Sequence, residues 1–244
     1  GGDRKPIVKN NITITEWYDY FKGVFGNGEN DNDFNNVQEG TEESVQFDDC
    51  NHILNQCITH GEVMNAIKDL SSGKSSGVDC ILSEMLKVGG ALVVNFLTKL
   101  FNTIFDKCMY PSEWAKAIVV PIFKKGNQEN PDNYRPISLL SIISKCYTSV
   151  LNKRLYNWLE NNDKICEQQA GFRKNYSTTD QIFNLYYMVQ KCLCRNGQKL
   201  YVGFVDFRKA FDSVRHDKLL EALHNEGISG KFFLAIKSMY SSLI

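Results

Sequence analysis

Residues 199–214 read KLYVGFVDFRKAFDSV and combine an apolar run with a carboxylate near its end. Residues 199–207 are rich in β-branched and aromatic side chains, which predicts a strand. A carboxylate on such an element is held rigidly, as a metal ligand must be. Because Mg²⁺ accepts only one or two protein carboxylates and takes its other ligands from water and phosphate, Asp206 is a candidate half-site. On spacing alone, capping of the following helix is the more ordinary role for Asp206, and Asp212 is either a second ligand or a solvated carboxylate.

Upstream of this stretch, two extended runs predict a β-hairpin with a basic tip. The runs are AIVVPIF at 117–123 and YRPISLL at 134–140, and a polar loop with glycine, asparagine and proline separates them. A proline in each run favours edge strands, because proline cannot donate to a ladder. Lys124, Lys125 and Arg135 flank the loop, although Lys-Lys-Gly by itself is a common solvated turn.

Helical apolar periodicity predicts helices around these strands. Thr59 and Glu62 have the spacing of a capping box, and Asp79 is placed to cap a helix that contains residues 81–86. Further helices are expected at 91–108, 142–160, 178–195, 208–226 and 230–243. Helices around a few strands, with one projecting hairpin, indicate an α+β (mixed α/β) fold.

The N-terminal region differs in composition from the rest of the chain. Residues 1–60 carry 11 acidic and 4 basic side chains (net −7), whereas residues 61–244 carry 17 acidic and 24 basic ones (net +7). Residues 26–36, GNGENDNDFNN, are predicted to be a mobile linker. Apolar residues at helical spacing over 17–25 predict a short amphipathic helix that docks on the main body. This pattern fits an acidic arm joined to a domain that faces phosphates.

The overall composition excludes several classes of protein. The 244 residues are 43% apolar and 12% aromatic, which excludes collagen, coiled coils and wholesale disorder. No uninterrupted apolar run is long enough to span a bilayer, and residues 1–6 lack the apolar core of a secretory signal. We therefore expect an intracellular protein that makes no membrane contact.

Eight cysteines are scattered through helix-like apolar stretches, which favours reduced core thiols over disulfides. Cys50, His52, Cys57 and His60 are all of zinc-ligand type. Only one residue separates the first two, however, where structural zinc sites usually have two to four. Ordinary packing or surface positions are therefore the preferred interpretation.

Five motifs follow one another along the chain. They are LSSGKSSGVD at 70–79, Trp114 followed by PIFKKG at 121–126, NYRPISLL at 133–140, QAGFRKNYST at 169–178 and the segment around Asp206. In this order, over about residues 53–244, they resemble the reverse transcriptases of non-LTR (LINE-type) retrotransposons.

The resemblance implies RNA-directed DNA synthesis by two-metal phosphoryl transfer, with Mg²⁺ or Mn²⁺ as the cofactor. An RNA template, a DNA primer and deoxynucleoside triphosphates are the implied partners. Asp206 would be the first catalytic carboxylate, and the backbone carbonyl of Phe207 would also touch metal. Phe211 would be an aromatic gate that rejects ribonucleotides by a clash with the 2′-hydroxyl, or else a core phenylalanine.

The resemblance also assigns the basic hairpin. Lys124, Lys125 and Arg135 would face the triphosphate, Arg135 through its planar fork and one of the two lysines as a mobile point charge. Which of the two lysines contacts the phosphate stays open.

Two glycine-containing motifs complete the implied site. Gly171, Phe172 and Arg173 would frame the template and nucleotide pocket, with a close backbone approach at the glycine and a phosphate contact from the arginine. Gly73 and Lys74 resemble an extra N-terminal motif near the template strand. A turn between helices with an exposed lysine explains them equally well.

The implied architecture is that of a right-hand polymerase. An acidic arm and linker with one short helix would occupy 1–57, fingers 58–198 and a partial palm 199–244. The family's aromatic-x-Asp-Asp motif is missing, since the sole Asp-Asp pair is Asp48-Asp49. We therefore expect a fragment truncated before that motif, nuclear by family resemblance only. Its oligomeric state stays open.

Two other interpretations remain. The chain could be a non-catalytic RNA-binding or interaction domain derived from the same family. It could also lack a stable fold, because half a palm leaves sheet edges and apolar faces uncovered.

This chain alone is expected not to extend a primer, because one carboxylate motif leaves a two-metal site incomplete. The measurement is incorporation of deoxythymidine on poly(rA)/oligo(dT) with Mg²⁺. Robust synthesis that disappears in the Asp206→Asn variant would contradict the expectation.

Overall fold

The computed structural model describes residues 11–25, 52–194, 198–207, 210–211 and 213–241. It divides into two compact units, the first built from residues 1–155 and 212–244 and the second from residues 156–211. Three features predicted from the sequence, the linker at 26–36, Cys50 and Asp212, lie outside the described residues.

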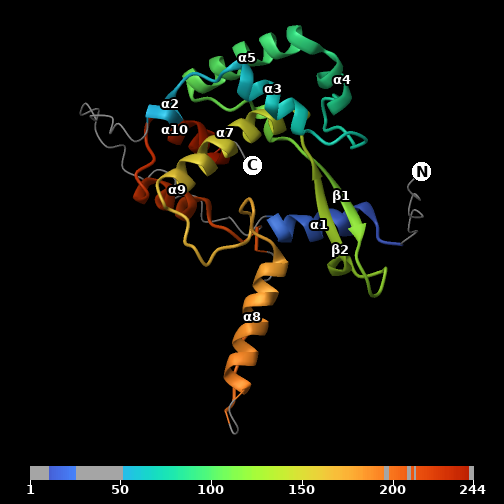
Figure 1. The fold of residues 1–244 in the computed structure, drawn as a ribbon. Coiled ribbons are helices and arrows are strands. Elements are labelled where there is room, and N and C mark those ends of the chain that lie inside the picture. The colour runs from blue at the N-terminus through green and yellow to red at the C-terminus, as the bar shows by residue number, and fades with distance from the viewer. Residues whose placement is uncertain (1–10, 26–51, 195–197, 208–209, 212, 242–244) are drawn as a thin grey trace. The chain divides into compact units, whose positions relative to one another are not determined.

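The first unit combines a layer of helices with one antiparallel hairpin (Figure 1). α1 (Ile14–Phe25) lies against the hairpin strands β1 (Ile118–Phe123) and β2 (Tyr134–Leu139). Over the described ranges, no helix is long and apolar enough to cross a bilayer. The other described helices of this unit are α2 (His52–Asn55), α3 (His60–Asp69), α4 (Ser83–Val88), α5 (Gly90–Lys107), α6 (Ser112–Ala115), α7 (Ile142–Asn161), α9 (His216–Asn225) and α10 (Gly230–Ser241). The last residues of α7 belong to the second unit, which also contains α8 (Thr178–Leu193).

The hairpin has the register that its two prolines require. Pro121 lies opposite Pro136, and within the described residues both strands are edges, as predicted. Gly126, at φ 96°, makes the turn, and a Cβ there would lie 2.9 Å from the side chain of Asn133. The Lys124 N–H donates to the Asn133 carbonyl at 2.8 Å, which closes the loop.

The core of the first unit is centred on α5 and α7, each of which buries one apolar face. Phe101, Tyr110, Trp114 and Tyr147 form an aromatic cluster with ring centroids 5.3–6.5 Å apart. Such pairs contribute roughly 0.5–1.5 kcal/mol each beyond their area burial, so the cluster ties the two helices together. Fully buried side chains around it include Leu54, Val63, Leu97, Phe105, Val150, Leu220, Ile228 and Phe232.

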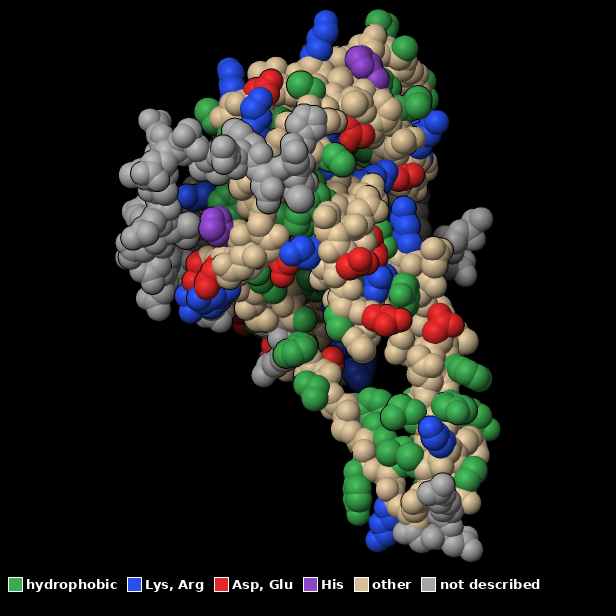
Figure 2. Space-filling model, turned by 60° about the vertical axis from the view of Figure 1, so that its left-hand side comes forward, with side chains coloured by type: hydrophobic (Ala, Val, Ile, Leu, Met, Phe, Trp, Pro, Cys, Tyr) green, Lys and Arg blue, Asp and Glu red, His purple; other side chains and the backbone are tan. Residues whose placement is uncertain are grey.

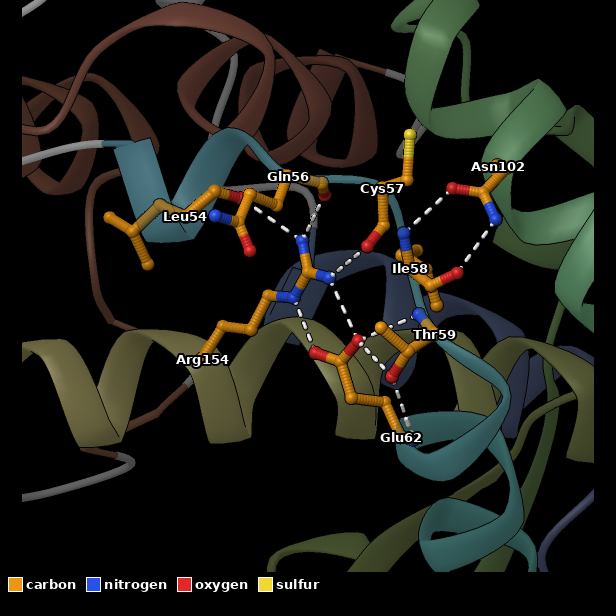
Figure 3. A network of polar contacts seen from close by, with 8 residues as sticks. All are labelled: Leu54, Gln56, Cys57, Ile58, Thr59, Glu62, Asn102 and Arg154. Atoms are coloured by element: carbon orange, nitrogen blue, oxygen red, sulfur yellow. Dashed lines mark hydrogen bonds and ion pairs between the residues drawn. The ribbon is translucent and has the colours of Figure 1, made fainter.

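A buried guanidinium joins α7 to the chain around α2 and α3 (Figure 3). The side chain of Arg154 is 7% exposed and donates to both carboxylate oxygens of Glu62, at 2.5 and 2.8 Å. It also donates to the carbonyl oxygens of Leu54, Gln56 and Cys57 at 2.6–3.1 Å. Since arginine has five N–H donors, every donor of Arg154 is used.

Glu62 also completes the capping box that the sequence predicts for α3. Thr59 Oγ1 accepts from the Glu62 N–H at 3.3 Å, and Glu62 Oε2 accepts from the Thr59 N–H at 2.8 Å. Burial raises the pKa of Glu62, but hydrogen bonds from Arg154 and Thr59 and the guanidinium charge outweigh it and hold that pKa below its usual value. One carboxylate therefore caps α3 and neutralises Arg154.

Two asparagines fix the same segment on its other sides. Asn102 of α5 accepts from the Ile58 N–H at 2.7 Å and donates to the Ile58 carbonyl at 2.8 Å. Asn55 accepts from the Phe232 N–H at 2.9 Å and donates to the Ser229 carbonyl at 3.2 Å, at the start of α10. Residues 54–59 thus connect α3, α5, α7 and α10.

The prediction of a strand at 199–207 is wrong, because these residues have no regular structure. A strand needs a neighbour that pairs with its backbone N–H and C=O groups. The described residues contain one ladder, between β1 and β2, and so offer this segment no partner. The helix predicted at 208–226 correspondingly begins later, at His216, with Arg215 as its N-cap residue.

Asp79 does not cap a helix as predicted. Its Oδ1 accepts from the Ile81 N–H at 3.2 Å inside the loop, and α4 begins after Leu82 without a side-chain cap. The carboxylate is used locally because it lies too far before the first helical turn.

The prediction of core thiols holds for only one cysteine. All seven described cysteines are free, but Cys146 alone is buried. Cys57, Cys80 and Cys166 are exposed because they lie in loops between helices.

The second unit exposes most of its apolar side chains. Ser177 and Asp180 form a capping box at the start of α8, in agreement with a helix that follows Ser177, yet no residue of α8 is buried. Hydrophobic side chains gather on the surface of this unit in Figure 2. The large exposed ones include Ile182, Phe183, Tyr186, Tyr187, Met188, Leu193, Tyr201, Val202, Phe204 and Val205.

The Arg154→Met variant is expected to lose about 3 kcal/mol of unfolding free energy, because it removes the five hydrogen bonds of the guanidinium and leaves the Glu62 carboxylate without its counter-charge. Chemical denaturation measures the loss. The matched control is Lys153→Met, which removes an exposed ion pair with Asp69 and should cost about 0–1 kcal/mol. Equal losses in the two variants would contradict the role given to Arg154.

Candidate functional site

The three cations predicted to face phosphate lie on the hairpin of the first unit. Arg135 pairs with Ile122 across the two strands, and Lys124 and Lys125 follow β1 directly. All three side chains are exposed. Among the described residues none forms an ion pair with them, so their charges are available to an anion in solution.

Strand alternation gives the hairpin two different faces. Tyr134 is buried on one face, where its ring lies 5.3 Å from that of Phe123 and 4.9 Å from that of Trp17 in α1. Arg135, one residue later, points to the opposite face. That second face is open and also carries partly exposed aliphatic side chains, which are Ile118, Val120, Ile122 and Ile137.

Asp206 lies in the second unit on an exposed segment without regular structure. The alternative role of helix cap is wrong, because α9 has Arg215 as its N-cap residue. Phe207, whose carbonyl is the other predicted metal contact, is exposed as well. Within the described residues, no three His, Cys, Asp or Glu side chains come together as a metal site.

Two aromatic residues from separate motifs meet in the second unit. The rings of Phe172 and Phe211 lie 6.0 Å apart in an edge-to-face arrangement, although the side chains are 89% and 79% exposed. Phe211 is therefore not the core phenylalanine of the alternative interpretation. Phe172 has φ 63°, a left-handed conformation that bulky residues rarely adopt and that often marks a functional position. Around Gly171 a Cβ would meet nothing within 4 Å.

Arg173 has a partner that the sequence did not predict. Its guanidinium donates to both carboxylate oxygens of Glu160 at 2.8 and 2.9 Å and lies 4.5 Å above the ring centroid of Tyr176. Hydrogen bonds from Arg173 hold the pKa of Glu160 below its usual value. A third nitrogen donates to the Cys166 carbonyl at 3.2 Å. The guanidinium therefore fixes the loop that contains the predicted pocket residues.

An open depression of about 450 Å³ adjoins this loop, lined by polar side chains between Glu167 and Asn184. Its lining includes Asn175 and Tyr176 of the motif at 169–178, together with two earlier residues of the loop and residues in the first turns of α8 that the sequence analysis did not single out.

Gly73 and Lys74 lie in a turn of the first unit. Gly73 has φ 70°, and its N–H donates to Glu84 Oε1 at 2.5 Å. Lys74 is exposed. The turn between helices is thus confirmed, and template contact by Lys74 stays a prediction.

The residues predicted to act together fall into two groups. Lys124, Lys125 and Arg135 share the hairpin, and Phe172 shares a surface with Phe211. Both groups lie in a range, residues 122–244, that matches the family model described as reverse transcriptase (RNA-dependent DNA polymerase).

The chain belongs to the reverse transcriptase family. The match extends over just more than half of its residues and includes Asp206, whereas Gly73 and Lys74 precede it. Reverse transcriptases generally use divalent metal ions, and the family activity requires an RNA template, a primer and deoxynucleoside triphosphates.

Three curated relatives carry the name of RNA-directed DNA polymerases of mobile elements. The chain is 33% identical over 162 residues to the probable RNA-directed DNA polymerase from transposon BS of Drosophila melanogaster, an alignment that covers 65% of the chain and 18% of the relative. The corresponding protein from the X-element is 34% identical over 158 residues, 64% of the chain and 17% of the relative. The jockey polymerase of the same organism is 29% identical over 164 residues, 67% of the chain and 18% of the relative.

These matches confirm the prediction of a non-LTR (LINE-type) reverse transcriptase fragment. The chain spans less than a fifth of the length of each of these three relatives.

The Arg173→Gln variant is expected to loosen the loop, because glutamine cannot bind both oxygens of Glu160 and cannot stack as a cation on Tyr176. Hydrogen exchange should show backbone amides of residues 164–176 exchanging several times faster. Lys191→Gln on exposed α8 is the matched control and should leave these amides unchanged. Unchanged exchange in Arg173→Gln would show that the ion pair does not hold the loop.

Proposed function

We propose that this chain carries nucleotide- and template-binding residues of an RNA-directed DNA polymerase of a non-LTR retrotransposon. The observation that carries the proposal is the hairpin, where Lys124, Lys125 and Arg135 are exposed without an ion pair among the described residues. Cations held on one hairpin suit a triphosphate, whose charge shifts toward the leaving group during transfer. The planar fork of Arg135 can bind two oxygens at once, and a lysine supplies a movable charge.

Asp206 is proposed to hold a divalent ion, Mg²⁺ or Mn²⁺, together with the backbone carbonyl of Phe207. Both are hard oxygen ligands of the type that Mg²⁺ binds, and Mg²⁺ takes its remaining ligands from water and phosphate. The strand that would have held Asp206 rigidly is not formed, so the ligand type and the exposure of the segment support this proposal. A bound ion of this kind stabilises charge on the attacking and leaving oxygens of phosphoryl transfer. Asp206 contributes negative charge and a binding position.

Phe211 is proposed as the gate against ribonucleotides. Its exposed ring meets that of Phe172, so two rigid planes stand where a sugar and a base could contact them. The empty space around Gly171 supports a close approach of a ligand to the backbone there.

Two further roles stay proposals on less direct support. Arg173 was predicted to contact phosphate, and its pairing with Glu160 supports a positioning role in the same pocket. Gly73 and Lys74 offer a lysine on a tight turn, which suits contact with a template backbone.

The proposal includes the architecture implied by the family. Residues 58–198 would form fingers and residues 199–244 part of the palm, after the acidic arm at 1–57. We also propose that the protein acts in the nucleus, which rests on its resemblance to the family alone.

The hairpin is tested by the affinity of the chain for a fluorescent RNA–DNA hybrid, measured by anisotropy over a range of salt concentrations. The triple variant Lys124→Ala, Lys125→Ala, Arg135→Ala is expected to bind at least about tenfold more weakly near 0.1 M salt. The slope of its log affinity against log salt concentration should be less steep by about 1 to 3, because fewer phosphate contacts form and fewer counterions are released.

The matched control replaces three exposed helical lysines, Lys68, Lys99 and Lys107, by alanine. Overall charge changes equally in the two triple variants, so an equal loss of affinity would contradict a specific role for the hairpin. A wild-type chain that does not bind the hybrid at low salt would overturn the proposed function.

A further inference from the structure

We propose that α1 braces the β1–β2 hairpin and that Trp17 is a positioning residue for the hairpin's cations. The bracing itself concerns contacts within the first unit. Its effect on ligand binding rests on the function proposed above for Lys124, Lys125 and Arg135.

An aromatic contact joins α1 to the buried face of the hairpin. The Trp17 ring meets the Tyr134 ring edge-to-face at 4.9 Å, and Tyr134 in turn lies 5.3 Å from Phe123 across the strand pair. Within α1, Trp17 stacks on Phe21 at 5.4 Å. The half-buried side of α1, at Trp17, Tyr20 and Phe21, thus faces the hairpin.

Polar contacts extend the brace to the hairpin loop. The Tyr20 hydroxyl donates to Asp132 Oδ1 at 3.1 Å, and Asn11, just before α1, donates to Glu129 Oε1 at 3.3 Å. The helix therefore contacts both a strand and the loop, which restricts bending as well as sliding of the hairpin.

The hairpin needs such support. An isolated two-stranded sheet is marginally stable in water and gains independent stability by packing against a helix. Each strand has only six residues, and within the described residues each pairs with the other alone, so the ladder by itself gives little support.

The brace acts on the cations through strand geometry. Neighbouring residues of a strand point to opposite faces, so the position of Tyr134 under Trp17 fixes the direction in which Arg135 projects. A hairpin that rocks away from α1 would carry Arg135 with it.

The brace also holds two acidic side chains of the loop. Glu129 and Asp132 are the carboxylates nearest in sequence to the cationic tip, and each accepts a hydrogen bond from the α1 region. Release of these carboxylates would let them pair with Lys124 or Lys125 and compete with a phosphate ligand.

The first experiment measures hydrogen exchange in the full chain. In Trp17→Ala, the amide protons shared between β1 and β2 should exchange about tenfold faster, while those of α5 and α7 keep their protection and show that the fold persists. Tyr18→Ala is the matched control, because Tyr18 is 64% exposed on the other side of α1; it should change neither group. Unchanged hairpin exchange in Trp17→Ala would overturn the brace.

The second experiment measures affinity for the RNA–DNA hybrid. Trp17→Ala should weaken binding severalfold, Trp17→Phe should restore most of it, and Tyr20→Phe should weaken it by releasing Asp132. In the background of the hairpin triple variant, Trp17→Ala should have no further effect, because the two changes act through one element. Equal losses in both backgrounds would contradict a positioning role.

The two proposals fail in different ways. If the wild-type chain does not bind the hybrid, the proposed function fails, and hydrogen exchange still decides whether α1 braces the hairpin. If exchange rises in Trp17→Ala but affinity does not fall, the brace exists and its positioning role is wrong.

Discussion

The guanidinium of Arg154 is the interaction on which the first unit depends. It neutralises Glu62 and binds the carbonyl groups of Leu54, in α2, and of Gln56 and Cys57, between α2 and α3. Lysine could not replace it, because an ammonium group has three donors and no planar fork. The contact fixes α7 against α3. Since β2 leads into α7 after only two residues, it also fixes the base of the hairpin.

A close backbone approach strengthens that base. A Cβ on Gly77 would lie 2.5 Å from the carbonyl carbon of Leu140, so the turn at 71–79 fits against the junction of β2 and α7 only with glycine there. The hairpin cations are thus attached to a packed frame. Asp206, Phe172 and Phe211, in contrast, lie on exposed backbone in the second unit, where few apolar contacts restrict local opening.

Sequence reasoning succeeded where structure depends on neighbouring residues. The capping box at Thr59 and the helical patterns of α5, α7 and α8 are local signals, and the proline-containing hairpin was found from the same kind of signal. The strand at 199–207 failed because pairing needs a distant partner that composition cannot reveal. The role of Arg154 was missed, and the pairing of Arg173 with Glu160 was not predicted, for the same reason. Glu62 lies 92 residues from Arg154, and no local pattern marks the pair.

Catalysis by this chain's family depends on divalent metal, and we propose that the exposed carboxylate of Asp206 binds such an ion. Paramagnetic broadening by Mn²⁺ in the isotope-labelled chain detects this binding, since the effect is strong even for weak binding. We expect saturable broadening of the amide signals of residues 205–207, lost in Asp206→Asn and kept in Asp163→Asn. Broadening spread evenly over the acidic surface, or unchanged in Asp206→Asn, would contradict the claim.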